Sequence, residues 1–514
     1  MPSVLWPGFA WRQAILVALL VLGLVSEAGA GAGETQPIRM GLAGPPRNLD
    51  PRLATDATSS RVNALLYRQL TRFDAQSRPV PDLATWEQLG PTRYRFTLGG
   101  EGRDFSTGQR LTSSDVKATY ESALDPTMAS PHRASLENIS EILVEGPDRL
   151  EFHLRQADPL FPGYLGLGLV PAELIEAGHP FAQQPVGSGP FRLLSWPQPG
   201  RLVLERRRDG QVIELLTVKD ANVRVMKLLR GEIDLLQNDL APELVGFLRG
   251  HDQVRLETAP GSNFSYLGFS LADPVTGLPQ VRQALALAID RQEILTYLYQ
   301  GRGRLATGLF PPEHWAAGGE GAEPVHDPTR ARALLAELGY GMDRPLQLSY
   351  KTSSDPLRIR FATIIQAQVA RVGIELRIQS YDWGTFFDDI RAGRFQLYGL
   401  TWVGIRSPDI FRYVFHSRSV PPEGANRGRY ANPEVDRLIE VAHGEPDLER
   451  QAALYQRIQT ILLQDLPYIP LWYEDQFYAA RPEIRGYRLA GDGNYDALAR
   501  VGRWVAAQPE PGAP

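Results

Sequence analysis

The stretch from Leu357 to Ile378 decides the fold class. It reads LRIRFATIIQAQVARV up to Val372, then Gly373, then IELRI. Apolar residues spaced three and four apart in the first part predict an amphipathic helix, which the glycine ends. Strict alternation of apolar and charged residues in the second part predicts a β-strand. A helix joined this tightly to a strand is typical of α/β structure.

Segments on both sides of this unit continue the alternation of helix and strand. Residues 385–392 have a helical pattern, and Phe395–Thr401 (FQLYGLT) is typical of a buried strand. Upstream, Asp327-Pro328 and Gly339 bracket a further predicted helix, and Pro279 opens another. These repeats predict βαβ units, in which ligands bind at the ends of strands.

The N-terminal half shows the same elements. Arg93–Leu98 (RYRFTL) alternates as a strand with one wet face, and Thr112 precedes Asp115 with the spacing of a helix capping box. Strands are predicted at 202–205 and 213–218, followed by a helix after Asp220. We expect this helix to bury one face that contains Val225, Met226 and Leu229.

The composition is that of an ordinary globular protein. The 514 residues include 54 basic and 59 acidic side chains, for a formal net charge of −5, and 43% of the residues are hydrophobic. This balance excludes a strongly basic nucleic-acid-binding protein and a largely disordered chain. The lack of cysteine excludes disulfides, thiolate metal sites and a lipid-modified cysteine.

The first 30 residues have the features of a secretory signal. Arg12 precedes the apolar run Ala14–Val25, and small residues follow at 28–30. The run is shorter than the roughly 20 residues that a membrane-spanning helix needs. We therefore expect residues 1–30 to be a cleavable signal, with an uncleaved anchor as the alternative. The mature chain is expected to be periplasmic and not a lipoprotein.

The sequence lacks the motifs of the common catalytic and metal sites. Its eight histidines are scattered without a spacing such as HxxxH. Gly187-Ser188-Gly189 lacks the spacing of a dinucleotide-binding loop or a nucleophile elbow and is interpreted as a turn. Adjacent acids such as Asp388 and Asp389 do not face each other on a helix. We expect no metal, no cofactor and no catalysis.

Aromatic residues lie beside polar ones in three predicted loop or strand-end segments. These are Asn263–Tyr266, Tyr381–Trp383 and Trp402, which ends a predicted buried strand. Such groups are typical of a recognition pocket, although each aromatic side chain taken singly is also typical of a hydrophobic core.

A series of short motifs along the chain resembles one family, the periplasmic solute-binding proteins of ABC importers, family 5, which includes the dipeptide, oligopeptide and nickel types. The motifs are NLDP at 48–51, VPDLATW at 80–86, FSTG at 105–108, TSSDV at 112–116, GSGPF at 187–191, GEID at 231–234 and VRQALALAIDR at 281–291. Each motif alone is weak. Their number and their order along nearly the whole chain carry the resemblance.

The resemblance implies an α/β protein with the two-lobed periplasmic binding protein fold, of type II and the large cluster C type. The first lobe is expected to contain an extra subdomain. The expected parts are 31–263 with 480–507 as lobe I, 61–174 within it as the extra subdomain, 264–479 as lobe II, and 508–514 as a flexible tail. Hinges near Asn263–Tyr266 and Tyr473–Tyr478 are expected to let the lobes close around a ligand.

The resemblance also indicates where a ligand would bind. Thr55 and Asp56 align with a first-lobe segment that contacts ligand in peptide-binding relatives, although Asp56 is equally suited to starting a helix. Those relatives place an aspartate for the peptide α-ammonium group after the strand that carries Trp402. This sequence has Ile405 there, in a loop one residue shorter, followed by Arg406. The arginine suits a carboxylate or phosphate ligand, or is an exposed loop residue.

Other side chains are expected to complete the site. Asp56, Asp382 or Asp409 would have to replace the missing aspartate for a free peptide to bind, and Lys351 lies beside the position of a carboxylate-binding arginine in dipeptide binders. The candidate ligand-binding residues are Thr55, Asp56, Asn263, Tyr266, Lys351, Tyr381, Asp382, Trp383, Trp402, Arg406 and Asp409.

The resemblance implies a receptor and not an enzyme. The protein is expected to be a monomer that captures peptides or peptide-like solutes and delivers them to a membrane permease with its ATPase subunits, and to bind no nucleic acid. The alternative is a non-peptide solute such as an opine, a sugar-like compound or a metal chelate. A secreted hydrolase on the same scaffold is the alternative from another class, and it would need a nucleophile and a base in contact.

Overall fold

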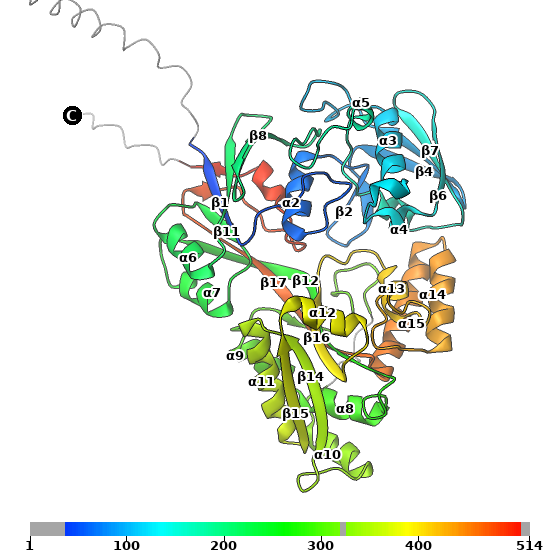
Figure 1. Ribbon diagram of the computed structural model, residues 1–514, viewed down its shortest axis with the longest axis vertical. Coiled ribbons are helices and arrows are strands. Elements are labelled where there is room, and N and C mark those ends of the chain that lie inside the picture. The colour runs from blue at the N-terminus through cyan, green and yellow to red at the C-terminus, as the bar shows by residue number, and fades with distance from the viewer. Residues whose placement is uncertain (1–35, 319–324, 505–514) are drawn as a thin grey trace, which may run out of the picture.

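Two long antiparallel strands, β12 (Arg255–Phe269) and β17 (Tyr468–Ala480), run through the centre of the protein (Figure 1). They belong to one large sheet with the strand order β15-β14-β16-β12-β17-β11-β1-β10-β9-β8, and β13 pairs beside β17. Because β12 and β17 lie in the middle of this order, they connect the two lobes.

The computed structural model describes residues 36–318 and 325–504. The predicted signal at 1–30 and the predicted tail at 508–514 lie outside the described residues. Within the described part, no helix is long and apolar enough to cross a membrane.

The first lobe is built on β1, β8, β9, β10 and β11, and the second on β14, β15 and β16. In each lobe a central strand has parallel neighbours: β1 pairs with β10 and β11, and β14 pairs with β15 and β16. The strand bounds are β1 Ile38–Leu42, β8 Phe191–Gln198, β9 Arg201–Arg206, β10 Val212–Thr217, β11 Leu235–Gln237, β13 Arg304–Leu305, β14 Leu346–Ser353, β15 Ile374–Tyr381 and β16 Leu397–Trp402. The two-lobed α/β fold is therefore confirmed.

Helices cover both faces of the second-lobe sheet. Alternation along β12 sends Leu267 and Phe269 to one core with α8, α10 and α11, and sends Phe264 and Tyr266 to the other with α12–α15. The helices are α2 Ala57–Leu66, α3 Ser113–Leu124, α4 Arg133–Leu136, α5 Ala172–Glu176, α6 Ala221–Leu229, α7 Pro242–Arg249, α8 Pro279–Ala288, α9 Arg291–Tyr297, α10 Pro328–Glu337, α11 Pro356–Ala370, α12 Trp383–Arg391, α13 Ile410–Phe415, α14 Pro433–Gly444 and α15 Leu448–Asp465.

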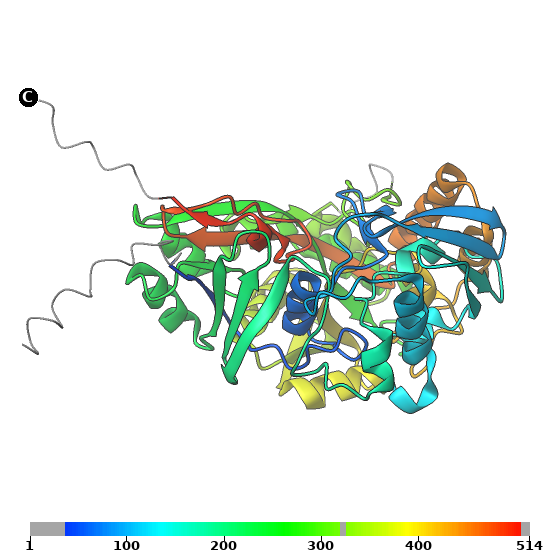
Figure 2. The same cartoon turned by 90° about the horizontal axis from the view of Figure 1, so that it is seen from above.

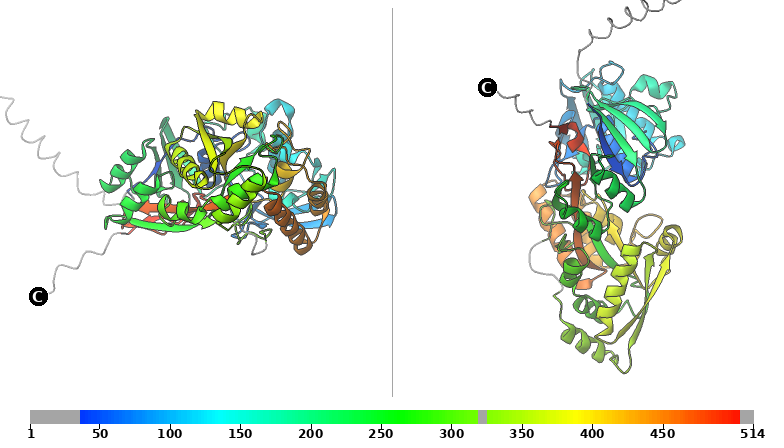
Figure 3. Two further views of the ribbon diagram at one scale, coloured as in Figure 1. Left: turned by 90° about the horizontal axis from the view of Figure 1, so that it is seen from below. Right: turned by 90° about the vertical axis from the view of Figure 1, so that its left-hand side faces the viewer.

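A separate four-stranded sheet, in the order β4-β5-β7-β6, packs against α3 and lies within 61–174, where the sequence predicts an extra subdomain. Figures 1 and 2 show it on the same side of the molecule as α14 and α15, and the right view of Figure 3 shows the first lobe above the second. The remaining strands are β2 Thr71–Phe73, β3 Pro79–Pro81, β4 Ala84–Gly90, β5 Arg93–Leu98, β6 Ile139–Val144, β7 Arg149–Leu154, β18 Ile484–Arg485 and β19 Gly502–Arg503.

Most predicted elements are confirmed within one or two residues. The strand at Arg93–Leu98 is β5, and the helix predicted from Thr112 is α3, whose capping box with Asp115 is formed. The predicted face of α6 is wrong at one position: Met226 is 42% exposed, whereas Leu228 is buried with Val225. Residues three positions apart, such as Val225 and Leu228, lie on the same face of a helix, whereas adjacent residues such as Val225 and Met226 do not.

Candidate functional site

Two adjoining cavities are lined by the first lobe and, in each case, by one residue of the loop after β16 in the second lobe. The larger has a volume of about 1090 Å³ and the smaller about 460 Å³, and both are large enough for a small organic solute. They share a wall from α2 and the segments near it, formed by Ser60, Ala64, Gln69, Phe73 and Gly166. Because they share these residues, the two cavities are parts of one cleft.

The second lobe reaches this cleft through the loop after β16. Gly404 lines the smaller cavity and Arg406 the larger. Gly404 has φ +70°, a left-handed conformation that glycine adopts without strain, which turns the loop toward the first lobe. The loop therefore closes a cleft whose other described walls come from the first lobe.

Arg406 contacts the first lobe directly. Its guanidinium forms an ion pair with Asp492 and lies 5.3 Å from the centre of the Phe73 ring. Its backbone carbonyl accepts a 2.8 Å hydrogen bond from Nε2 of His314. Arg406 is thus neither a free loop residue nor free to take up a ligand without exchanging a partner.

His314 holds this loop from beneath. Its Nδ1 accepts a 3.0 Å hydrogen bond from the backbone N–H of Ala316, and its ring stacks on Phe310 at 3.8 Å between centroids. Burial lowers the pKa of His314 to about 4, against the smaller opposing effects of the Arg406 carbonyl and Asp74. The neutral ring is therefore the form that fits this site at neutral pH.

Trp402 and Tyr266 lie together at the end of β16. Trp402 is half-buried and packs near the Tyr266 ring at 6.5 Å, and the guanidinium of Arg427 lies 5.1 Å from its ring. Tyr266 is 1% exposed and stacks on Tyr468 at 4.0 Å, and burial raises its pKa well above the ordinary value. Tyr266 belongs to the second-lobe core and supports Trp402 from behind.

Asn263 is half-buried on β12 opposite Glu474 of β17. Nearby, the hydroxyl of Ser265 donates a 2.9 Å hydrogen bond to Glu474 and lies 2.6 Å from the hydroxyl of Thr401. Arg358 completes this polar cluster with a 3.5 Å contact to Glu474. The cluster could not be predicted from the sequence, because its members come from four separate elements.

Lys351 and Tyr381 lie together at the ends of β14 and β15. The Lys351 ammonium is 2.5 Å from Oδ2 of Asp389 and 5.3 Å from the centre of the Tyr381 ring. The hydrogen bond from Lys351, followed by that from Arg394, lowers the pKa of Asp389. The charge of Lys351 is thus compensated within the second lobe.

The acids considered as substitutes for the missing aspartate lie at helix starts. Asp56 caps α2 and accepts hydrogen bonds from the N–H of Ser59 at 2.9 Å and its hydroxyl at 2.6 Å. Asp382 caps α12, accepting from the Thr385 N–H at 3.1 Å. Asp409 precedes α13 and lies 4.0 Å from Nδ1 of His443.

Asp56, Asp382 and Asp409 are absent from the described lining of both cavities. Two further predicted residues lie at the surface: Thr55 is exposed, and Trp383 is 59% exposed and stacks on Phe387 at 5.5 Å. Of the predicted residues, Arg406 alone appears in the described cavity lining. Ligand binding by the others stays a prediction.

The family model for bacterial extracellular solute-binding proteins, family 5, matches residues 78–420, which is more than half of the chain. The chain belongs to this family. In this family 5 solute-binding protein of ABC importers, the second-lobe loop at 402–409 lies inside the matched region. Asp492, the ion-pair partner of Arg406, lies beyond that region.

Known members of family 5 match nearly the whole chain. The dipeptide-binding protein of Escherichia coli is 26% identical over 518 residues, which covers 91% of this chain and 95% of the relative. Among solved structures, the oligopeptide-binding protein AppA from Bacillus subtilis, in complex with a nonapeptide, has a TM-score of 0.75 at 22% identity and covers 93% of this chain and 100% of that one. NikZ from Campylobacter jejuni, in complex with Ni(L-His), has a TM-score of 0.77 at 22% identity, covering 91% and 99%.

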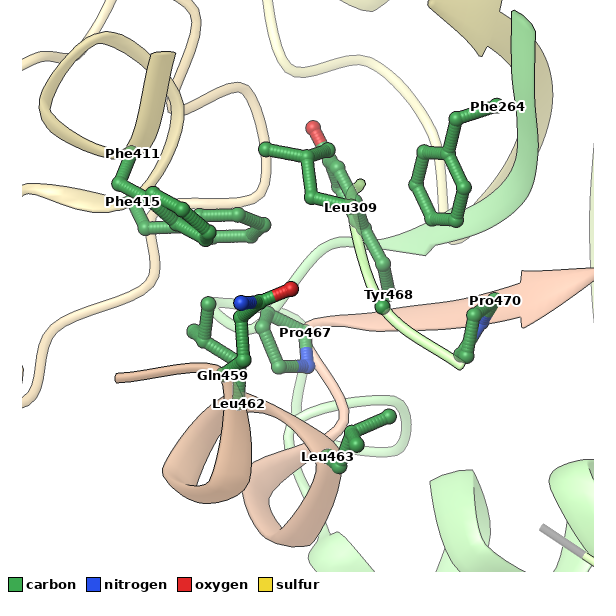
Figure 4. A pocket seen from close by; sticks show the side chains of 11 residues that line it. Phe264, Leu309, Phe411, Phe415, Gln459, Leu462, Leu463, Pro467, Tyr468 and Pro470 are labelled. Atoms are coloured by element: carbon green, nitrogen blue, oxygen red, sulfur yellow. The ribbon is translucent and has the colours of Figure 1, made fainter. Parts of the chain in front are cut away.

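A third, much smaller cavity of this family 5 protein lies inside the second lobe (Figure 4). Its volume is about 30 Å³, and its walls include Phe264, Leu309, Phe411 and Tyr468. Figure 4 shows these apolar side chains facing the gap between α15 and the strands. Because the space holds about one water molecule, we interpret it as a packing gap and not as a solute site.

Most of the charged lining of the larger cavity was not predicted from the sequence. The arginines that line it, besides Arg406, are Arg68, Arg72, Arg206, Arg207, Arg208 and Arg500. The run Arg206–Arg208 was a visible signal in the sequence, but Arg68 and Arg72 lie in a separate segment and Arg500 lies in another. Within the described ranges, no group of three or more His, Cys, Asp or Glu residues is placed to hold a metal ion.

Proposed function

We propose that this protein is a periplasmic receptor that captures peptides or peptide-like solutes between its two lobes and delivers them to an ABC permease with its ATPase subunits. The observation that carries the proposal is the cleft between the lobes, which the 402–409 loop closes from the second lobe. The dipeptide-binding protein of E. coli, at 26% identity over nearly the full length, supports a peptide as the solute.

Closure of the cleft is proposed to use the two long strands as hinges. The expected boundaries between the lobes lie between residues 263 and 264, within β12, and between residues 479 and 480, at the end of β17. The register between these two strands shifts between Ala259 and Asn263. A bulge of this kind bends a strand and interrupts its hydrogen-bonded ladder. The expected hinges at Asn263–Tyr266 and Tyr473–Tyr478 lie beside it.

A binding role without chemistry is favoured by the contents of the cleft. Ser60, Ser135 and His132 line the smaller cavity, yet no hydrogen bond joins either serine hydroxyl to the histidine ring among the described contacts. A nucleophile activated by a neighbouring base needs such contact. Among the described residues of this cavity, no contact of that kind supports a hydrolase on this scaffold.

A non-peptide solute is the second candidate, because one observation favours it. Ile405 replaces the aspartate expected for a peptide ammonium group, and Arg406 beside it carries the opposite charge. Burying an ammonium group without a counter-charge costs several kcal/mol. An anionic solute without a free amino group would avoid that cost.

Mass spectrometry of the mature protein, purified natively from a periplasm and then denatured, tests the proposal. We expect a mixture of short peptides to be released. One defined non-peptide mass would replace the peptide proposal with the second candidate. An empty protein that also fails to bind peptide pools in calorimetry would refute the peptide function and leave family membership as the only guide.

A further inference from the structure

The larger cavity of the cleft is lined by seven arginines and four aspartates. The arginines come from four parts of the chain that lie far apart in sequence: the α2–β2 region, the turn after β9, the loop around Arg406 and the loop around Arg500. Such an excess of one charge raises the local concentration of ligands of the other sign.

Three of these arginines have carboxylate partners. Arg68 pairs with Asp82 at 2.8 Å, and Arg406 pairs with Asp492. Arg206 is buried and donates to Asp209 at 2.8 and 2.9 Å and to two backbone carbonyls.

Arg207 differs from these three because its described partners are backbone carbonyls. It donates to the carbonyl of Asp104 at 2.7 Å and makes two longer contacts at 3.4 Å. These bonds hold the cavity wall without neutralising the charge of the guanidinium.

The other three arginines leave positive charge without a dedicated partner. Arg208 is exposed and lies 3.2 Å from Asp209, the same carboxylate that already binds Arg206. Arg72 and Arg500 are exposed to the cavity and form no side-chain hydrogen bond or ion pair within residues 36–318 and 325–504. Their guanidinium groups are therefore free to bind.

One acid in the same cavity competes with a ligand for these cations. Burial, followed by the neighbouring Asp492, raises the pKa of Asp496, and Arg406 and Arg72 lie near enough to oppose this shift in part. It forms no ion pair within 4.0 Å at the described residues. Asp496 thus offsets part of the charge of Arg72. Arg500 forms no ion pair with Asp496 or with any other acid among the described residues.

From this arrangement we infer that the larger cavity binds an oxyanion group of the solute, with Arg72 and Arg500 as its ligands. A guanidinium presents paired N–H donors that match a carboxylate or a phosphate, and it does so best where water is partly excluded. The inference rests on the proposed transport function, whose substrate class it narrows to anionic solutes. Acidic peptides and phosphorylated solutes share this chemistry.

The test is isothermal titration calorimetry with four probes on the full-length mature chain. Three are tetrapeptides of equal length: Ala-Glu-Glu-Ala, Ala-Gln-Gln-Ala and Ala-Lys-Lys-Ala. The fourth is glucose 6-phosphate. We expect an anionic probe to bind about tenfold or more tightly than the neutral peptide, and this preference to weaken as ionic strength rises.

Variants at the two free arginines decide the assignment. In Arg72→Gln/Arg500→Gln the preference for the anionic probe is expected to disappear, and in Arg72→Lys/Arg500→Lys part of it is expected to return. Arg371→Gln, at an exposed arginine that ends α11 in the second lobe, is the matched control. Thermal unfolding of each variant shows whether the fold is kept.

The outcomes separate this inference from the proposed function. If the neutral peptide binds as tightly as the acidic one and the double variant changes neither, the oxyanion site is wrong and peptide binding stands. If glucose 6-phosphate alone binds and depends on both arginines, the site stands and the peptide proposal falls. If none of the probes binds at concentrations up to about 1 mM, weaker than transport receptors need, both are overturned.

Discussion

Arg406 of the second lobe forms an ion pair with Asp492, which lies 86 residues further along the chain beside the first-lobe wall of the cleft. The two side chains are 25% and 27% exposed, so water screens the pair only in part. The ring of Phe73 lies 5.3 Å from the same guanidinium. A single side chain thus connects the second-lobe loop with two segments of the opposite wall.

Removal of this connection is expected to favour the open form. Arg406→Ala deletes the ion pair and the contact with Phe73, a loss of about 1 kcal/mol, which corresponds to an affinity for solute about fivefold weaker. Small-angle X-ray scattering is expected to show a larger radius of gyration in the variant. An unchanged radius and affinity would show that the ion pair does not contribute to closure.

Trp402→Ala is expected to weaken solute binding while the fold stays cooperative. Because the ring is half-buried between Tyr266 and Arg427, the free energy of unfolding should fall by about 1–3 kcal/mol, and affinity should fall about tenfold. Trp504→Ala is the control, since Trp504 also lies against an arginine, at 5.6 Å, but outside the cleft. A loss of stability with unchanged affinity would assign Trp402 to the core alone.

Stability is expected to fall in mild acid because of His314. Its folded pKa of about 4 lies below the ordinary value of 6.5, so the unfolded chain takes up a proton first as the pH falls. The stabilisation is fully present above pH 6.5 and is lost between about pH 6.5 and 4, by up to about 3 kcal/mol.

Urea unfolding at pH 7.0 and 4.5 measures this effect. His314→Gln should lose the histidine contribution to the pH dependence, and His251→Gln, at a half-buried histidine, should keep it. Since the folded ring stays neutral down to about pH 4, its hydrogen bond to the carbonyl of Arg406 is kept, and solute affinity of the native protein is not expected to change through His314 between pH 7.0 and 4.5. An identical pH dependence in His314→Gln and the native protein would contradict the assignment.

Gly189→Ala is expected to destabilise the protein. A Cβ atom there would meet the carbonyl oxygen of Leu65 and the carbonyl carbon of Leu66, each at 2.4 Å, where the segment packs against the end of α2. The cost should be about 1–3 kcal/mol, because backbone atoms cannot move aside as a flexible side chain can. Gly100→Ala, with no atom within 4 Å, is the control. Equal melting temperatures for the two variants would refute the close packing.

The local elements were predictable because their determinants are close in sequence. The stripe at Phe361, Ile365 and Val369 is buried on α11 as predicted, and Gly373 follows with φ +90° where the chain turns into β15. Hydrophobic spacing and caps act within a few residues, so they can be recognised without knowledge of the rest of the chain.

The pairing of candidate residues was not predictable in the same way. Lys351 was expected to face a ligand carboxylate, but it lies 2.5 Å from Asp389, which is 38 residues away on another element. Trp402 and Tyr266 were both predicted as ligand contacts. Because β16 and β12 are neighbouring strands, Tyr266 lies in the second-lobe core and packs behind the ring of Trp402. Burial and pairing of this kind depend on which strands become neighbours.

By itself the sequence determined the α/β class, the positions of most helices and strands, and a resemblance to family 5 that its motifs carry along the chain. Only the tertiary structure decided what the cleft presents to a solute. It brings Arg72, Arg207, Arg406 and Arg500 to one cavity from four segments that are far apart in the chain. A charge acts over roughly 10 Å in space whatever its distance along the chain, so this positive lining exists only once these segments are folded together.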